Sequence, residues 1–185
     1  CGAGEQMPVI GMFLGGAGLA DTMLYCREKI YPLGLPNGLS HALTALAVLA
    51  RLFLRLKAGF LPPHPSQVAV SWCNSQTLSG RFSLLAVTTL DKLLLSSELS
   101  GRSKGSLRLV AIDERPASLL RAFFANLSGQ LGQSKLSGVH YEESDEISIE
   151  GESKVILDGE TFRSEIGRPI FLKLAQPLSF VRIAA

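Results

Sequence analysis

The stretch VILDGETF, residues 155–162, lies near the end of the chain and holds an Asp-Gly pair between two apolar runs. Asp and Gly both tolerate a positive φ angle, so this pair is a strong signal for a two-residue turn between two β-strands. The Glu160 that follows allows a second interpretation, because a carboxylate on a rigid turn can point into a cleft. The local residues favour a plain hairpin and leave the second interpretation open.

The composition of the 185-residue chain is that of a globular protein with a substantial core. Its 18 basic and 16 acidic side chains give a net charge of +2, which is too small for a protein that binds nucleic acid through bulk charge. The 3 cysteines and 3 histidines are scattered and match no zinc spacing. An odd number of widely spaced cysteines suits the cytoplasm better than secretion.

Alternating apolar and polar residues with turn signals between them predict a fold that is mostly β with helices (α+β), a sandwich or barrel in a single domain covering residues 1–185. Helices are expected near residues 19–31, 38–58 and 116–128, and GGAG, residues 15–18, is expected to be a turn. The candidate strands are residues 8–14, 68–72, 81–89, 106–112, 139–142, 146–150, 154–157, 170–174 and 179–183.

The expected helix at residues 38–58 is apolar on nearly every side until Arg51, Arg55 and Lys57. Its uncharged run, residues 42–50, is far shorter than the roughly 18–20 residues that cross a bilayer. One interpretation is a buried helix. The other is a helix on a membrane surface, with these three cations at the lipid headgroups, which predicts peripheral association.

Several segments in order give the chain a wider resemblance. They are GLAD (residues 18–21), YPLG (31–34), FSLLAVTTL (82–90), the Asp-Gly-Glu of VILDGE, and PIFLKLAQPLSFVRI (169–183). Together they resemble the C-terminal half of the diacylglycerol kinase and sphingosine kinase superfamily of lipid kinases. In that family an N-terminal domain binds ATP through a Gly-Gly-Asp-Gly-Thr-type loop, and a C-terminal β-sandwich, of a fold shared with NAD kinases, accepts the lipid.

The chain has no such glycine loop. The resemblance therefore implies a lipid-side domain whose N-terminal nucleotide-binding domain precedes Cys1 in the same parent chain. ATP and Mg²⁺ would be bound mainly by that missing domain, and the partners of this chain would be that domain, a lipid substrate and the membrane surface. The chain alone is expected to be inactive.

The resemblance also assigns roles to residues. Glu160 would be the general base for the lipid hydroxyl, with Asp158 and Gly159 forming the turn that aims it. Asp21 would orient the lipid headgroup, although a helix N-cap or first-turn acid explains an aspartate there equally well.

One segment departs from the family. Many bacterial members have Asp-Gly-x-Leu-Asp, which helps to hold a structural Mg²⁺, where this chain has Lys104 to Arg108 in KGSLR. Cations at these positions would repel a metal, so we expect no metal in this domain, and Lys104 or Arg108 could supply positive charge directly to an anion. Three functions remain open: a lipid kinase domain, a non-catalytic lipid-binding or regulatory module, and a small-molecule kinase of the same broad fold.

Overall fold

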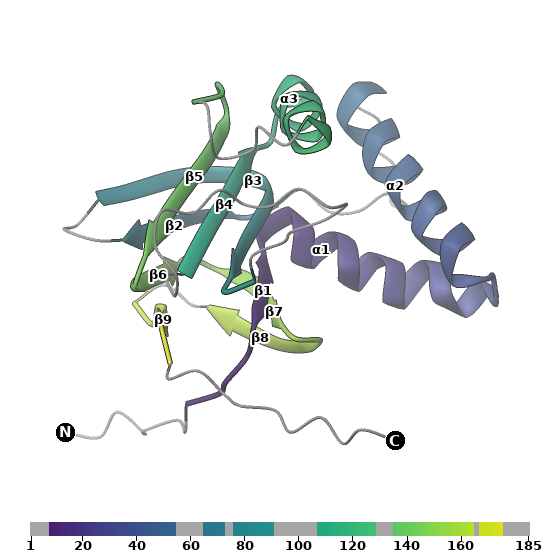
Figure 1. Cartoon of the computed structure of the whole chain (residues 1–185). Helices are drawn as coiled ribbons and strands as arrows, with labels where there is room; N and C mark the ends of the chain where they lie inside the picture. The colour runs from purple at the N-terminus through teal and green to yellow at the C-terminus, as the bar shows by residue number, and fades with distance from the viewer. Residues whose placement is uncertain are drawn as a thin grey trace, which may run out of the picture.

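The computed structural model describes residues 8–54, 65–72, 76–90, 107–128, 135–164 and 167–175. Within them, nine strands form one antiparallel sheet that bends into two packed layers (Figure 1). The strands are β1 Phe13–Gly16, β2 Gln67–Trp72, β3 Gln76–Thr88, β4 Leu107–Asp113, β5 Val139–Ser144, β6 Glu146–Glu150, β7 Ser153–Leu157, β8 Glu160–Ser164 and β9 Ile170–Lys173. The predicted α+β, mostly β class is confirmed.

The long strand β3 joins the two layers. Its first half, up to Arg81, pairs with β2, and its second half, from Phe82 to Thr88, pairs with β1 and β4. The register is irregular between Phe82 and Leu84, where the strand passes from one layer to the other. Such an irregularity bends a strand and increases its twist, which is how a single sheet becomes a sandwich.

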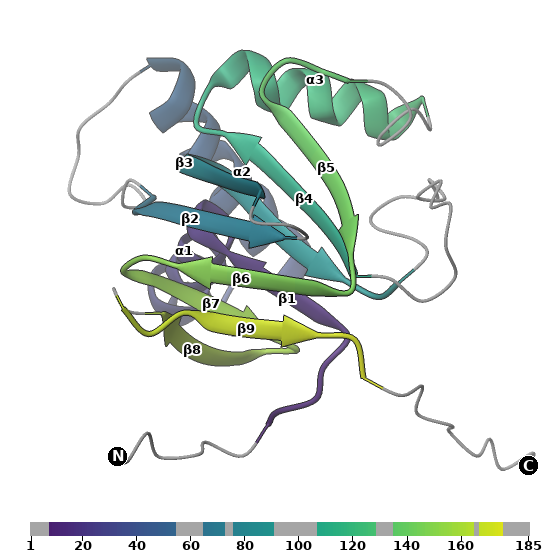
Figure 2. The same cartoon turned by 90° about the vertical axis from the view of Figure 1, so that its left-hand side faces the viewer.

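One layer has the order β8-β7-β1-β3-β4-β5, and the other continues from β3 through β2, β6 and β9. Figure 2 shows β2, β6 and β9 in front of β8, β7 and β1. The edge strands β8 and β9 therefore face each other across the interlayer space. That space is filled by buried apolar side chains from both layers, including Val70, Phe82, Leu85, Leu109, Ile149 and Val155.

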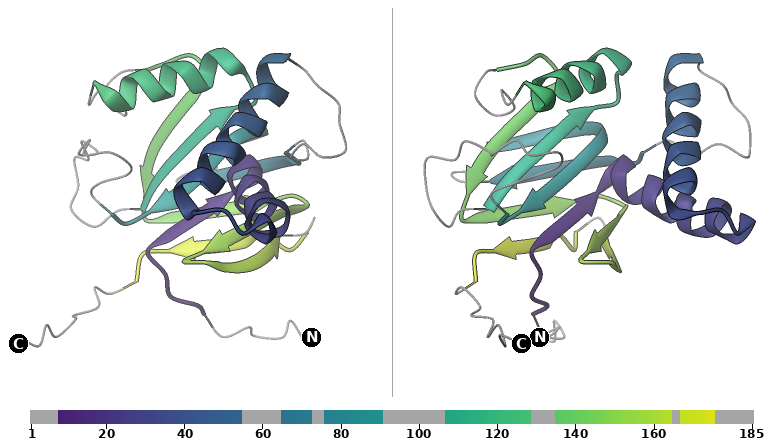
Figure 3. Two further views of the ribbon diagram at one scale, coloured as in Figure 1. Left: turned by 90° about the vertical axis from the view of Figure 1, so that its right-hand side faces the viewer. Right: turned by 45° about the vertical axis from the view of Figure 1, so that its right-hand side comes forward.

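The described residues include three α-helices: α1 Ala17–Tyr25, α2 Asn37–Leu54 and α3 Pro116–Leu127. Helix α1 packs on β3 and β7, and short π-helical and 3₁₀ turns extend it to Leu33. Figure 3 shows α1 and α2 on one side of the molecule, with α3 across the end of β4 and β5. Among the helices described, none is long and apolar enough to cross a membrane.

The structure corrects the expected start of the domain. The first strand begins at Phe13 and not at Pro8, and GGAG is not a separate turn, because Gly15 and Gly16 end β1 and Ala17 begins α1. Ala17, at the junction of β1 and α1, has a positive φ of 50°. Gly18 is required there, since a Cβ atom would lie 2.5 Å from the Ser83 carbonyl oxygen. The strand β8 was also missed, and the expected strand at 179–183 lies outside the described residues.

Helix α2 has a mixed inner face, where Leu43 and Ala47 pack against the cluster of Tyr25, Cys26 and Ile30, and an apolar outer face. Ser40 and Thr44 are buried, and both hydroxyls donate to main-chain carbonyl oxygens. Leu46 is 62% exposed, and Leu49 and Phe53 are also exposed. The expectation of a helix buried on its apolar sides is therefore wrong, because the sheet layers already provide the core and α2 lies outside them.

Candidate active site

VILDGETF forms the β7–β8 hairpin, with Leu157 paired to Glu160. Asp158 and Gly159 make the two-residue connection with φ angles of 46° and 100°. Positive φ at both central residues is the pattern of a type I′ turn, whose twist matches the flanking strands. The hairpin predicted from Asp-Gly is confirmed.

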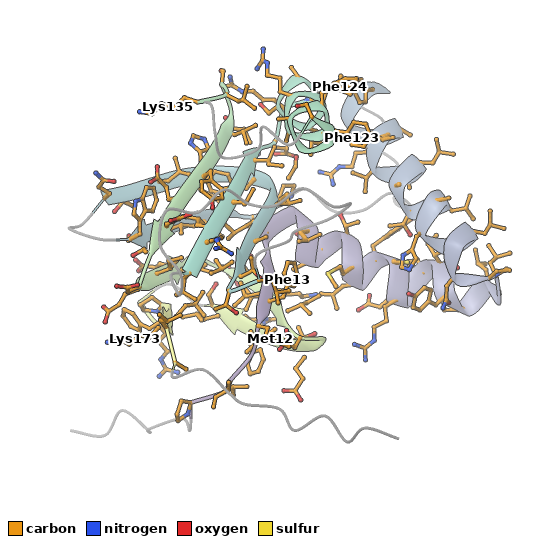
Figure 4. All side chains as sticks on the ribbon, in the orientation of Figure 1. Met12, Phe13, Phe123, Phe124, Lys135 and Lys173 are labelled. Carbon is orange, nitrogen blue, oxygen red and sulfur yellow. The ribbon has the colours of Figure 1, made fainter. Side chains whose placement is uncertain are left out.

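The Asp158 side chain fastens this turn to the first strand. Its two carboxylate oxygens accept hydrogen bonds from the backbone amides of Met12, at 2.8 Å, and Phe13, at 2.9 Å. The Asp158 amide donates to the Phe13 carbonyl oxygen at 3.0 Å. Gly11 permits the approach, because a Cβ there would lie 2.6 Å from Leu157 Cδ1 and 2.9 Å from Asp158 Oδ2. Figure 4 shows Met12 and Phe13 at the start of β1, beside the hairpin.

Glu160 is exposed at the first position of β8. Side chains alternate along a strand, so Glu160 shares its face with Phe162 and Ser164. That face is the inner one: Ser164 is fully buried, and Phe162 packs against the core between the layers. The structure therefore places the Glu160 carboxylate at the solvent end of an apolar row that leads inward.

A groove of about 580 Å³ opens between the two edge strands, next to this row. It reaches the core residues Leu14 and Val155, and its rim includes the Pro8–Val9 segment. Its lining is mainly apolar and consists of Pro8, Val9, Leu14, Val155, Leu157, Phe162, Arg163, Arg168, Pro169, Ile170, Phe171 and Leu172. Its volume lies within the roughly 300–1,000 Å³ of small-molecule sites.

Asp21 lies elsewhere. It is half-buried in the second turn of α1, so the N-cap and first-turn interpretations are wrong. Burial raises the pKa of its carboxyl, while the charges of Lys154 and Arg51 act to lower it. Lys154 and Leu157 are three residues apart on β7, which corresponds to about 10 Å. The structure thus does not bring Asp21 and Glu160 together.

Arg51 points into the protein. Its Nη2 lies 3.3 Å from Glu114 Oε1, and the two side chains are only 10% and 16% exposed. Burial lowers the Arg51 pKa, while Glu114 and Asp21 act to raise it. Arg51 therefore does not contact lipid headgroups in this conformation, contrary to the expectation. Arg55, Lys57 and Lys104 lie outside the described residues.

Arg108 is also internal. It is 4% exposed, donates from Nη1 to the Leu90 carbonyl oxygen at 2.8 Å, and lies 3.9 Å from Glu143. The Tyr141 hydroxyl donates to the same Glu143 at 2.8 Å, and burial together with this bond raises the Tyr141 pKa. The cation that replaces a family aspartate is thus neutralised inside the protein. No group of three or more potential metal ligands occurs within the described residues.

No family model matches this sequence, and no curated protein matches it either. The structure is similar to a crystal structure described as a "putative diacylglycerol kinase" from Bacillus anthracis str. Sterne, with a TM-score of 0.51 and 16% identity over 90% of this chain. The chain has a diacylglycerol kinase-like fold. A second structure with the same description gives a TM-score of 0.49 at 15% identity. The chain spans about 50% of the length of each.

Sequence reasoning missed two parts of this site. Nothing in the sequence pairs Asp158 with the amides of Met12 and Phe13, because main-chain donors carry no residue signal. The groove was missed for a different reason: β8 was not predicted, so Phe162 had no assigned face. The alternation of Glu160, Phe162 and Ser164 with Thr161 and Arg163 was the available signal.

Proposed function

We propose that this chain is the substrate-side domain of a lipid kinase and that Glu160 is its general base. One observation carries the proposal: in a diacylglycerol kinase-like fold, an exposed carboxylate stands on a rigid hairpin next to Leu157, which lines an apolar groove. A lipid that carries a hydroxyl matches both parts of this arrangement. Its hydrocarbon suits the apolar groove, and its hydroxyl can give its proton to the carboxylate as the oxygen attacks. Diacylglycerol and sphingoid-type lipids are the substrate classes.

In the proposed reaction the lipid oxygen attacks the γ-phosphorus of ATP. The new P–O bond forms as the bond to the ADP oxygen breaks, and the hydroxyl proton passes to Glu160. A carboxylate can accept it from about 3 Å. The Asp158 bonds hold the hairpin against β1, so the position of Glu160 is set before the substrate binds.

The phosphates require cations and a metal for positioning and charge neutralisation. Arg108 does not fit that task, because it is paired inside the protein. We propose that ATP and Mg²⁺ are bound mainly by an N-terminal nucleotide-binding domain of the parent protein, as the family resemblance implies. The isolated chain would then bind lipid without turnover.

The exposed side of α2 supports a peripheral contact with a cytoplasmic membrane surface. Leu46, Leu49 and Phe53 form an outward apolar stripe at helical spacing, which suits insertion at the boundary of headgroups and acyl chains. Arg55 and Lys57 follow this helix in the sequence and would add attraction to anionic lipids.

The test is ATP-dependent phosphorylation of a lipid panel by the intact parent protein and by its Glu160→Gln variant. We expect Glu160→Gln to lower kcat by about 10²–10⁴-fold, the range for loss of a general base. Glu152→Gln, at an exposed glutamate in the connection between β6 and β7, is the matched control and should keep full activity. Equal activity in all three proteins would exclude Glu160 as the base.

A non-catalytic lipid-binding module is the second candidate. The replacement of family aspartates by cations in KGSLR, with Arg108 buried and paired, favours it. Its signature in the same assay is lipid binding by the parent protein without phosphorylation by any variant.

A further inference from the structure

The groove between β8 and β9 has a depth and polarity that specify what it can hold. It passes the edge strands and reaches Leu14 on β1 and Val155 on β7, which are 3% and 1% exposed. Val155 lies one strand inward from β8, and Leu14 lies two strands inward. The cavity is therefore part of the interlayer core that the two edges leave open.

A β-strand from another chain is a poor occupant for this space. A strand that paired with β8 or β9 would continue one layer at its edge and would leave the volume between the layers unfilled. A thin, flexible apolar chain can enter between the layers and contact Phe162 on one side and Leu172 on the other. Both of these side chains pack against the same core cluster.

The polar end of the groove sets the orientation. Leu157 lines the groove and is paired with Glu160 across the hairpin, so the Glu160 carboxylate lies next to the groove lining. Arg163 and Arg168 line the groove farther along, near the connection from β8 to β9. The ligand that fits is an amphiphile whose hydroxyl-bearing end lies at the solvent end of the row.

We propose that the groove between β8 and β9 binds one hydrocarbon chain of the lipid, between Phe162 and Leu172, with the lipid hydroxyl directed to Glu160. The proposal rests on the proposed function for the role of the hydroxyl. The binding of the chain itself requires no ATP and no chemistry, so it can be measured separately.

The single tryptophan of the chain is a built-in reporter. Trp72 pairs with Ile147, and Ile147 pairs with Leu172, so Trp72 lies two strands from the groove, about 10 Å across the sheet. The probe is a monoacylglycerol with bromine atoms on its acyl chain, used below its micelle concentration without ATP. We expect saturable quenching of Trp72 fluorescence, with none from the unbrominated lipid.

Two arginine variants test the site. Leu172→Arg places a charge in the groove and should weaken binding by about tenfold or more, because a charge in an apolar site must be desolvated. Phe124→Arg is the matched control on α3, away from the groove lining, where Phe124 is 63% exposed, and should bind as the unmodified chain does. Leu172→Ala provides a milder change, with several-fold weaker binding, in case the arginine variant does not fold.

Absence of phosphorylation by the unmodified parent protein, with quenching intact, would count against the kinase function and not against the groove. Absence of quenching, or equal quenching in the Leu172→Arg and Phe124→Arg variants, would overturn the proposal. A dimer that Leu172→Arg dissociates would also overturn it, since the groove would then be a contact between copies.

Discussion

At the scale of single residues, Asp158 combines an unfavourable backbone conformation with three favourable hydrogen bonds. A φ of 46° costs an ordinary L-residue roughly 1–2 kcal/mol, and aspartate tolerates it better than most. Hydrogen bonds to a charged acceptor each contribute about 1.5–3 kcal/mol when they are sheltered, and less when exposed as here. The carboxylate therefore more than offsets the strain of the turn.

Replacement of Asp158 can separate these two effects. Asp158→Gly removes the carboxylate and relieves the strain, and should lower the free energy of unfolding by about 1–2 kcal/mol. Asp158→Ala also loses the carboxylate but keeps the strained φ, and should cost about 1 kcal/mol more than glycine. Urea denaturation gives both values, and amide exchange at Met12 and Phe13 should accelerate in each variant. A glycine variant as stable as the unmodified chain would mean that the two amide bonds contribute nothing.

The half-buried Asp21 should make stability depend on pH. Its pKa is raised in the folded chain, chiefly by burial, so the native state holds this proton to a higher pH than the unfolded state does. The contribution of Asp21 to stability is complete below its ordinary pKa and is lost as the pH rises through the folded value. Asp21→Asn should therefore match the unmodified chain at pH 3 and be more stable at pH 7, as measured by urea denaturation at both pH values. A variant that is less stable at pH 7 would show that attraction to Lys154 and Arg51 outweighs burial.

At the scale of elements, α2 is held on its inner face by both apolar packing and polar contacts. The Arg51–Glu114 pair ties its last turns to the segment between β4 and α3. Loss of one member leaves the other charge poorly solvated, so Arg51→Ala and Glu114→Ala should each lower the free energy of unfolding by about 1–3 kcal/mol. The double variant should cost less than the sum of the two, and a double-mutant cycle measures the difference. Strict additivity would indicate that the pair is not coupled.

Strands were predictable from sequence where apolar and polar residues alternate clearly, and the glycine-rich start of the domain was not predictable. Residues 146–150 and 170–174 alternate clearly, and β6 and β9 lie there. Residues 160–164 do not, because Glu160 and Thr161 are both polar and only Phe162 signals a strand. The prediction for the start of the domain failed because the glycines at 15, 16 and 18 indicate a turn. Their role is instead to allow the close approach of α1 to β3. The burial of α2 was predicted wrongly, because a sequence with apolar residues on nearly all sides of a helix does not indicate which side is covered.

The same limits apply to the candidate site. The hairpin and the place of Glu160 on it followed from three residues, since Asp-Gly between apolar runs has few other solutions. The separation of Asp21 from Glu160 could not be foreseen, because it depends on where α1 lies along β7. Likewise, no pattern indicates that Arg51 and Arg108 turn inward to Glu114 and Glu143, as each pair joins distant parts of the chain.

At the scale of the whole molecule, a ligand that binds in the groove between β8 and β9 should raise the free energy of unfolding. A ligand that binds only the folded chain at 100 times its Kd adds about 2.7 kcal/mol to the free energy of unfolding. For a domain of this size, that corresponds to a rise in Tm of roughly 5–10 °C. We expect this rise with the monoacylglycerol, and we expect it to be lost in Leu172→Arg and retained in Phe124→Arg. An unchanged Tm at saturating lipid would contradict binding of the lipid in the groove.

Pro8 and Leu172, near the two ends of the described chain, border the same groove. A domain joined through either end would thus be tethered beside Glu160, at an effective concentration in the millimolar range for a short linker. Two such domains supplied as separate pieces at micromolar concentration would meet about a thousandfold less often. Reconstitution of a split protein should therefore fail at ordinary assay concentrations, even if each half folds and binds its own ligand, and should recover when a peptide linker restores the connection.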